Sequence, residues 1–378
     1  MKLNMNFGKI AIVLICIFLC VLVISCDQEP LFWDVANEYP PIEPLIKGHP
    51  TKIVAVGTTL YVSNGNSVWV YDVTTDPLSP AWKRLDPPAV GRTIDIAAAG
   101  SALYALDNNG NLRKFDGTNW SPPLNINAVS PLVNNGKLEC IFGGGVFLFA
   151  GTRTGSYESY NIKGYDILVI NTGTDKIVGN RQETGKLMGV AAITGTYYLG
   201  TLGGGVFNST GGNPAGPEPT LATNVVGITS DGTNLYIASS RRIQICSGAA
   251  FFAEISGYFS GSIAVWNHGS DKLLLVGIQY SSSTNGYGYR EMNIGLGSYS
   301  LVYPGNGAVT SVNPSSQYIS AIGKHVINFF YVMPDTFTPE ADNDGRPIIF
   351  ASTIKDGLWS YRMRNGNAQW NGEDNSGF

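Results

Sequence analysis

The chain has 378 residues and a formal net charge of −4 at pH 7. Charged residues make up 14% of it, whereas about 25% is usual for a soluble domain, and no run is rich in Lys or Arg. Proteins that bind nucleic acids present a basic patch or stripe, so we expect no nucleic-acid partner. The 46 Gly and 19 Tyr residues are typical of short strands joined by tight turns.

The first 25 residues have the pattern of an export signal. Lys2 and Lys9 supply positive charge, and an unbroken apolar stretch runs from Ile10 to Ile24. This stretch of about 15 residues is short for a membrane-spanning helix but suits the hydrophobic core of a signal peptide. We therefore predict that residues 1–25 are a signal peptide.

The signal ends in Val23-Ile24-Ser25-Cys26. This ending resembles the lipobox of bacterial lipoproteins, in a relaxed form similar to that of spirochaete lipoproteins, because Val23 stands where strict versions carry Leu. The resemblance implies cleavage before Cys26, a diacylglyceryl group on the Cys26 thiol and an acyl chain such as palmitate on its amine. Several acyl chains hold a protein stably to a membrane. The alternative is an uncleaved signal anchor in which Cys26 is incidental.

Residues 26–50 are predicted to form the lipidated cysteine and a Pro-rich tether. Prolines favour an extended, semi-rigid path, and the segment contains Pro30, Pro40, Pro41, Pro44 and Pro50. We expect a mature protein anchored in the bacterial cell envelope, on its periplasmic or surface side.

A phrase recurs from residue 51 onward: an aliphatic run, a Gly, an aliphatic–Tyr pair, a short turn and an aliphatic–aromatic pair. It occurs first over residues 53–72 and again over 94–117. Self-similarity at about 40–50 residues in a β-rich sequence indicates a propeller or a related array. We predict an all-β fold, a β-propeller of seven four-stranded blades over residues 51–372, with six or eight blades as alternatives. Residues 373–378 are predicted to be a flexible tail.

The inner strands of the first six units are predicted at 53–56, 94–99, 138–142, 190–193, 226–229 and 263–266. The seventh unit is stretched, and either 319–322 or 326–332 fits its inner strand. Cys140 and Cys246 fall in different units, so we expect two separate buried thiols.

The units resemble bacterial β-propeller repeats in general. They match no named subclass, because the WD dipeptide, the kelch double-Gly pattern and the Asp-box of sialidases are all missing. The propeller lipoprotein scaffold of the outer-membrane barrel assembly machine is similar in architecture and anchor, but its repeat pattern is absent here. Fold analogy alone does not assign a function.

One acidic run has the spacing of a cation loop. Glu340, Asp342 and Asp344 alternate before Gly345, which resembles the front half of a calcium loop, although Ala351 stands where a bidentate Glu is expected. Calcium is therefore the one cofactor that the sequence suggests. The alternative is a solvated acidic loop.

A set of polar and aromatic loops is the candidate binding site. Each occupies the connection between the second and third strands of its unit, so the loops are expected to meet on one face of the propeller. Tyr, Ser, Gly and Asn with occasional Arg make adaptable recognition surfaces. The candidate residues are Arg153, Tyr157 and Tyr160 in unit three, Arg241 and Arg242 in unit five, and Tyr280, Tyr287, Tyr289 and Arg290 in unit six. Tyr- and Gly-rich hairpin tips without a role are the alternative.

Catalytic chemistry has little support in the sequence. The chain has 3 His, far apart, and no nucleophile or metal constellation surrounds them. We therefore favour a binding or scaffold module for an envelope protein or glycan. One alternative is a carbohydrate-active enzyme whose carboxylates, for example Asp95, Glu139 and Asp231, meet at the propeller centre. A second alternative is a surface adhesin.

Overall fold

The structure is a computed structural model. It describes residues 46, 50–74, 82–87, 92–124, 137–156, 161–182, 184–248, 250–268, 271–278, 288–295, 299, 301–302, 322, 326–333, 347–353, 357–364 and 367–373. Pro44–Phe378 form one compact unit and Met1–Glu43 another. The predicted signal peptide and Cys26 lie outside the described residues. In the part of the chain that is described, no helix has the length and apolarity needed to cross a membrane.

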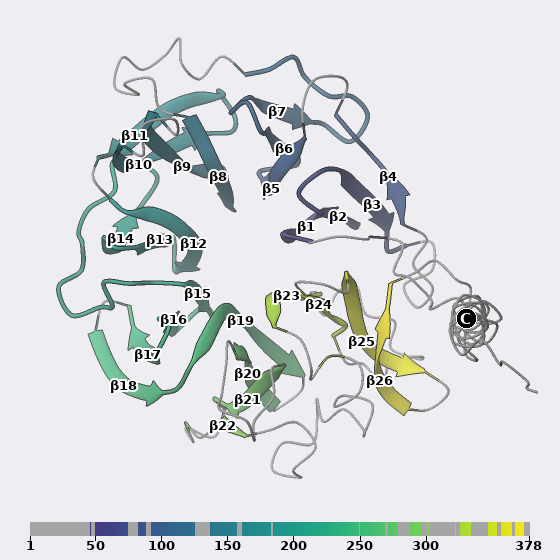
Figure 1. The fold of residues 1–378 in the computed structure, drawn as a ribbon, viewed down its shortest axis with the longest axis vertical. Coiled ribbons are helices and arrows are strands. Elements are labelled where there is room, and N and C mark those ends of the chain that lie inside the picture. Colours follow the sequence, from purple (N-terminus) through teal and green to yellow (C-terminus); the bar gives the residue numbers. More distant parts are fainter. Residues whose placement is uncertain are drawn as a thin grey trace, which may run out of the picture. The chain divides into compact units, whose positions relative to one another are not determined.

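The described residues of the larger unit form seven antiparallel sheets, each made of strands that are consecutive in the chain (Figure 1). Blades 1 to 3 contain β1 (Lys52–Val56), β2 (Thr59–Ser63), β3 (Val68–Asp72) and β4 (Lys83–Arg84); β5 (Thr93–Ala99), β6 (Ala102–Asp107) and β7 (Leu112–Phe115); and β8 (Lys137–Gly144), β9 (Phe147–Ser156), β10 (Asn161–Asn171) and β11 (Lys176–Arg181). Blades 4 and 5 contain β12 (Lys186–Ile193), β13 (Thr196–Leu202) and β14 (Gly205–Ser209), then β15 (Gly227–Ser230), β16 (Leu235–Ala238), β17 (Arg242–Ser247) and β18 (Ala250–Ser256). Blades 6 and 7 contain β19 (Phe259–His268), β20 (Asp271–Ile278), β21 (Tyr289–Asn293) and β22 (Leu301–Val302), then β23 (Ile327–Val332), β24 (Ile349–Thr353), β25 (Leu358–Arg364) and β26 (Asn367–Gly372).

The first strand of each sheet lies innermost, and the sheets follow one another around a common axis (Figure 1). This confirms the predicted all-β propeller with seven blades. In the seventh blade the inner strand is β23, so of the two predicted segments 326–332 is the correct one.

Blades 2 and 4 differ from the prediction of four strands each. Among the described residues each has three strands. A short segment takes the place of the fourth strand through isolated bridges, Phe115 to Trp120 in blade 2 and Asn208 to Ala215 in blade 4. These bridges cover the outer edges of β7 and β14, which would otherwise present unpaired backbone groups.

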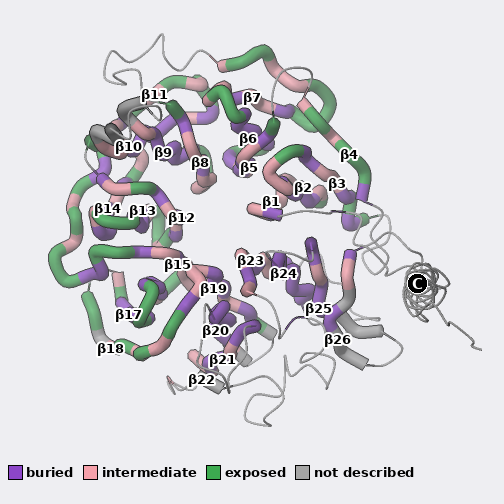
Figure 2. The backbone as a smooth tube through the Cα atoms, viewed as in Figure 1, coloured by how far each residue is buried: buried purple, intermediate pink, exposed green. Residues whose placement is uncertain are grey.

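Buried side chains form seven clusters, one at each contact between consecutive blades, including the contact between blades 7 and 1. Figure 2 shows the burial along the strands and the largely exposed outer strand β18. The recurring Leu–Tyr pairs of the sequence lie in second strands, where Tyr61, Tyr104 and Tyr236 are buried. A hydrophobic contact of this kind therefore stabilises each pair of neighbouring blades.

Glycine allows two pairs of inner strands to approach closely. A Cβ at Gly143 in β8 would lie 1.6 Å from the carbonyl oxygen of Ala98 in β5. A Cβ at Gly227 in β15 would lie 1.9 Å from the carbonyl oxygen of Gly261 in β19. No larger residue fits at these positions without movement of the backbone.

Within the described ranges, blades 1 and 7 meet without a shared strand. Trp82 of blade 1 is buried and donates its indole N–H to Glu373 Oε2 at 2.9 Å. Ser352 Oγ and Asn328 Nδ2 donate to the carbonyl oxygen of Pro50 at 2.8 and 3.1 Å.

These contacts correct the predicted boundaries of the folded body. Ile46 is fully buried in the cluster between blades 1 and 7, and Pro50 is also buried. The body therefore begins before residue 51, inside the segment predicted as tether. Glu373 is buried, so the body also extends beyond residue 372.

Cys140 and Cys246 are free thiols in different blades, as predicted. Burial raises the pKa of Cys246 to about 11. Burial, followed by the nearby Asp95 carboxylate, raises the pKa of Cys140 to about 12. Both thiols are protonated at neutral pH and are poor nucleophiles.

Glu291 in β21 is a fully buried carboxyl group. Neither of its side-chain oxygens accepts a hydrogen bond of standard geometry. Burial raises the pKa of Glu291 well above its ordinary value, and the neighbouring Tyr289 hydroxyl opposes part of the shift. A carboxyl group with a raised pKa binds its proton more tightly in the folded state, so it favours folding at low pH and opposes folding as the pH rises.

We predict that Glu291→Gln increases the free energy of unfolding at pH 8 but changes it little at pH 4. Above the ordinary carboxyl pKa near 4.5, the difference between variant and wild type should grow by about 1.4 kcal/mol per pH unit, until the folded-state pKa is reached. Urea unfolding of both proteins across this pH range measures the difference. A difference that does not change with pH would show that Glu291 does not titrate in this environment.

Candidate binding face

The connections of each blade emerge on two faces of the ring. Because β-strands alternate in direction, the connection between second and third strands always lies at the end where the inner strand begins. We call this side the top face. The turns between first and second strands, and between third and fourth strands, lie on the opposite side, the bottom face.

The predicted binding loops all connect second and third strands, so they share the top face. Arg153 lies in β9, Arg241 and Arg242 lie at the turn between β16 and β17, and Arg290 lies in β21. Tyr157, Tyr160, Tyr280 and Tyr287 lie outside the described residues. The shared face follows from the strand order, and the role of these residues stays a prediction.

Two of the predicted arginines form ion pairs. Arg153 Nε lies 2.9 Å from Glu139 Oε1, and the Arg153 side chain is only 10% exposed. Glu139 is the extra residue of a bulge in β8, which directs its side chain out of the regular strand pattern. Arg242 Nη1 lies 3.1 Å from Glu254 Oε2. That pair is open to solvent, so Arg242 keeps a substantial exposed surface.

Tyr289 is not a surface residue. It was predicted in the binding loop of blade 6, but it begins β21, and its side chain is fully buried between blades 6 and 7. Its ring packs edge-on against Phe330 and Trp370, with centroid distances of 5.4 and 5.8 Å. The strand starts earlier than the Tyr-Gly-Tyr composition suggests, so Tyr289 contributes to the core and not to a binding face.

The candidate calcium residues Glu340, Asp342 and Asp344 lie outside the described residues. Within the described ranges, no group of three or more His, Cys, Asp or Glu side chains could hold a metal ion. Calcium binding by the acidic loop stays a prediction.

The three carboxylates named for an enzymatic site each have a cationic partner of their own. Asp95 pairs with Lys52 and Glu139 with Arg153. Asp231 lies in the turn between β15 and β16, on the bottom face, with Lys272 Nζ 2.6 Å away. Burial alone would raise the pKa of Asp231, but hydrogen bonds from the Asn234 and Thr233 backbone, Lys272 and the Tyr236 hydroxyl lower it to about 2. Each of these three carboxylates is therefore engaged by a cation of its own, and an enzymatic site built on them stays a prediction.

Lys52 joins the inner strands of blades 1, 2 and 3. Its ammonium lies 2.8 Å from Asp95 Oδ1 and donates to the carbonyl oxygen of Ile141 at 2.6 Å. The Phe142 ring lies below it, with its centroid 3.8 Å from Nζ. Asp95 also accepts the backbone N–H of Ile141 at 2.8 Å. The Lys52 ammonium and the Asp95 carboxylate therefore contact each other and the backbone of blade 3, which indicates a structural role.

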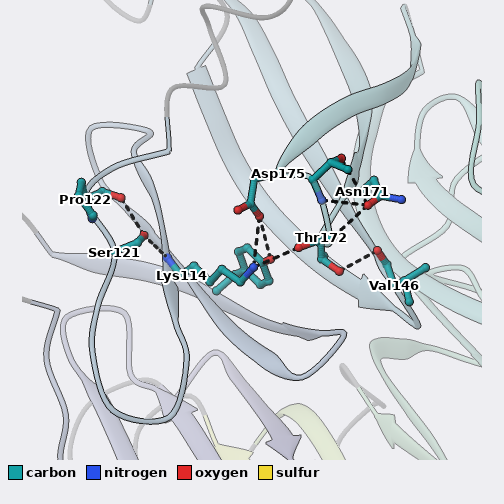
Figure 3. Close-up of polar contacts among 10 residues, drawn as sticks. Lys114, Ser121, Pro122, Val146, Asn171, Thr172 and Asp175 are labelled. Atoms are coloured by element: carbon teal, nitrogen blue, oxygen red, sulfur yellow. Dashed lines mark hydrogen bonds and ion pairs between the residues drawn. The ribbon is translucent and has the colours of Figure 1, made fainter.

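A second polar group joins blades 2 and 3 on the bottom face (Figure 3). Lys114 Nζ donates to the carbonyl oxygen of Thr172 at 3.1 Å and lies 3.5 Å from Asp175 Oδ1. The Tyr104 hydroxyl donates to the same Asp175 oxygen at 3.3 Å. Burial, then the Asp175 charge, raises the pKa of Tyr104, so this hydroxyl stays protonated and remains a donor.

The same chemistry recurs between blades 5 and 6. The Tyr236 hydroxyl donates to Asp231 Oδ2 at 2.9 Å, and Lys272 pairs with that carboxylate. Both of these bottom-face groups therefore hold neighbouring blades together. The top face of blades 4 and 5 carries exposed side chains, Arg241 and Tyr258 among them.

Comparison with known proteins supports the fold alone. No protein-family model and no curated protein matches the chain. Among solved structures, the computationally designed protein Ika8 is similar, with 9% identity and a TM-score of 0.54 over 87% of this chain and 90% of that one. The WD40 β-propeller domain of Doa1 is 11% identical, with a TM-score of 0.53 over 84% and 94% of the two chains. YCF48 bound to D1 peptide is 10% identical, with a TM-score of 0.53 over 85% and 96%. The chain is therefore a β-propeller by fold.

Proposed function

We propose that the protein is a lipid-anchored envelope module that binds another envelope protein through the top face of its propeller. The observation that carries the proposal is the presence of exposed cationic and aromatic side chains on the top face of blades 4 and 5. Bottom-face polar groups such as Lys114 and Asp231 are engaged between blades, whereas the top face carries Arg241 and Tyr258 as exposed side chains. A propeller similar in fold, YCF48, has been solved with a bound peptide, which supports this mode of action.

The top-face proposal is tested by site-specific photo-crosslinking in the native cells. A photoreactive residue at Ser240 or Thr223 would sample the top face, and one at Thr58 or Gly195 the bottom face; all four lie in or beside turns. We expect one crosslinked partner, identified by mass spectrometry, from the top-face positions. Equal crosslinking from both faces, or from the bottom face alone, would contradict the proposal.

The anchor rests on the ending Val23-Ile24-Ser25-Cys26. We predict that Cys26→Ala abolishes metabolic labelling with palmitate, leaves the precursor uncleaved and removes the diacylglyceryl group. Ser25→Ala is the matched control, because it keeps a small residue before the cysteine, and it should be processed normally. Labelling that survives in Cys26→Ala would show that Cys26 is not the attachment site.

A further inference from the structure

One sector of the top face, over blades 4 and 5, combines positive charge with exposed apolar side chains. It consists of Lys186, Leu202, Asn224, Arg241, Arg242 and Tyr258, and we call it the cationic strip. All six are exposed. Leu202 and Tyr258 are its two hydrophobic members, at 43% and 57% exposed.

Backbone pairing makes the first part of the strip continuous. Lys186 and Leu202 are cross-strand partners in β12 and β13. Leu202 in turn forms an isolated bridge with Asn224, which precedes the inner strand of blade 5. Leu202 is therefore a direct neighbour of both Lys186 and Asn224.

The second part of the strip consists of Arg241 and Arg242, at the turn between β16 and β17, and Tyr258, whose neighbours are hydrogen-bonded to that turn. Val226 donates its backbone N–H to Ala238 O at 2.8 Å, which links the inner strand of blade 5 to the strand before this turn. Gly257 donates to Arg241 O at 2.9 Å, and Phe259 to Ser240 O at 3.2 Å. Tyr258 lies between these two residues, so it is positioned beside Arg241.

The charges of blades 4 and 5 are distributed unevenly between the faces. Residues 184–256 contain three cations, Lys186, Arg241 and Arg242, and all three lie in the strip. The carboxylates of the same residues are Glu218, Asp231 and Glu254, and Glu183, just before them, lies outside the described residues. Asp231 is on the bottom face, Glu218 contacts Asn208 at the outer edge of blade 4, and of these three only Glu254 adjoins the strip. The strip is therefore cationic in a chain whose net charge is −4.

We infer that the cationic strip docks an acidic polypeptide segment that carries aromatic or aliphatic side chains. This inference rests on the proposed function and names the partner class for the same face. The three cations attract carboxylates and steer their approach. Leu202 and Tyr258 supply apolar contact area, which a carboxylate-rich chain with interspersed apolar side chains can cover. An anionic glycan would use the cations but would leave Leu202 without a complementary surface.

The test measures binding of a fluorescent random copolymer of Glu and Tyr to the full-length chain by anisotropy. We expect Arg241→Glu/Arg242→Glu to weaken binding by about tenfold or more, since each reversal adds repulsion as well as removing attraction. Leu202→Ser/Tyr258→Ser should weaken it by about fivefold. Matched changes on the bottom face, Lys176→Glu and Val146→Ser, should leave binding within about twofold of wild type; both residues are exposed there.

Three outcomes would overturn the inference. One is binding by the charge-reversed variant within about twofold of wild type. Another is equal weakening by the bottom-face changes. The third is tighter binding of heparin than of the copolymer, with no effect of Leu202→Ser/Tyr258→Ser, which would identify an anionic glycan as the ligand.

If top-face crosslinks in cells persist in the charge-reversed variant, the strip inference fails while the proposed function stands. If no top-face position of the otherwise unchanged chain gives a crosslink, the proposed function itself fails.

Discussion

Replacing Trp82 with alanine is expected to lower the free energy of unfolding by about 3–5 kcal/mol, the range found for large buried aromatic side chains. Trp82 is 2% exposed in the cluster between blades 1 and 7. Its ring packs against Tyr71 and Phe350, with centroid distances of 5.4 and 6.2 Å. Among the described residues no strand is shared between the first and last blades, so this cluster, the Glu373 hydrogen bond and the contacts of Pro50 hold the two blades together there.

The control for this prediction is Trp82→Phe, which keeps an aromatic ring but loses the indole N–H bound to Glu373. It should cost about 1–3 kcal/mol, because a buried carboxylate then loses one donor. Chemical denaturation followed by tryptophan fluorescence and circular dichroism measures both variants. A loss under about 1 kcal/mol for Trp82→Ala would mean that the contact between blades 1 and 7 contributes little to the stability of the ring.

Replacing Asp95 with alanine is the second large effect that we expect, at about 3–5 kcal/mol, because it leaves a largely buried ammonium without its carboxylate. Lys52 and Asp95 are 43 residues apart, and their side chains are 19% and 9% exposed. The change also removes the acceptor of the Ile141 N–H, so the inner strands of three blades lose a shared contact.

A double-mutant cycle separates the ion pair from the other effects of these changes. Lys52→Met and Asp95→Asn should each lower the free energy of unfolding. The loss in the double variant should be smaller than the sum of the two single losses, by at least about 1 kcal/mol. Lys114→Met, in the bottom-face group, serves as a comparison at a more exposed site. Additive losses at Lys52 and Asp95 would contradict a direct interaction between the two groups.

The repeat architecture could be predicted because the period is carried by short-range signals. The Leu–Tyr pairs identify second strands, and Asn/Gly turns such as the one at Gly65, which has a φ of 78°, identify hairpins. These features depend on local conformational preferences. Among the residues that the structure describes, blades 2 and 4 have three strands each, and isolated bridges at Trp120 and Ala215 cover the edges where fourth strands were predicted.

The site could be predicted only in part, because its contacts are long-range. The connections between second and third strands share one face because strand order alone determines it, independently of any side-chain contact. Tyr289 was misassigned because a Tyr-Gly-Tyr run is equally compatible with a hairpin tip and with a strand beginning opposite Gly277. Leu202 and Tyr258 were missed because an apolar side chain in a β-rich sequence is usually buried. Only the position of Leu202 at the end of its strand, before three glycines, distinguishes it in the sequence.

Substitutions in the cationic strip and in the bottom-face polar groups should affect the stability of the fold differently. Tyr104 and Tyr236 fix carboxylates between blades, so changes there are expected to alter folding. Arg241 and Tyr258 are exposed, so changes there should alter binding with little effect on unfolding. Variants of the strip that unfold like wild type are therefore suitable for measuring recognition alone.

Hydrogen–deuterium exchange of the full-length chain, with and without the Glu/Tyr copolymer, tests most directly whether binding occurs through the top face. We expect slower exchange in the presence of the copolymer at residues 201–204, 223–226, 239–242 and 257–259. The bottom-face turns at 57–58, 145–146 and 194–195 should be unchanged. Protection confined to the bottom-face turns, or no protection at the four top-face segments, would contradict binding through this face.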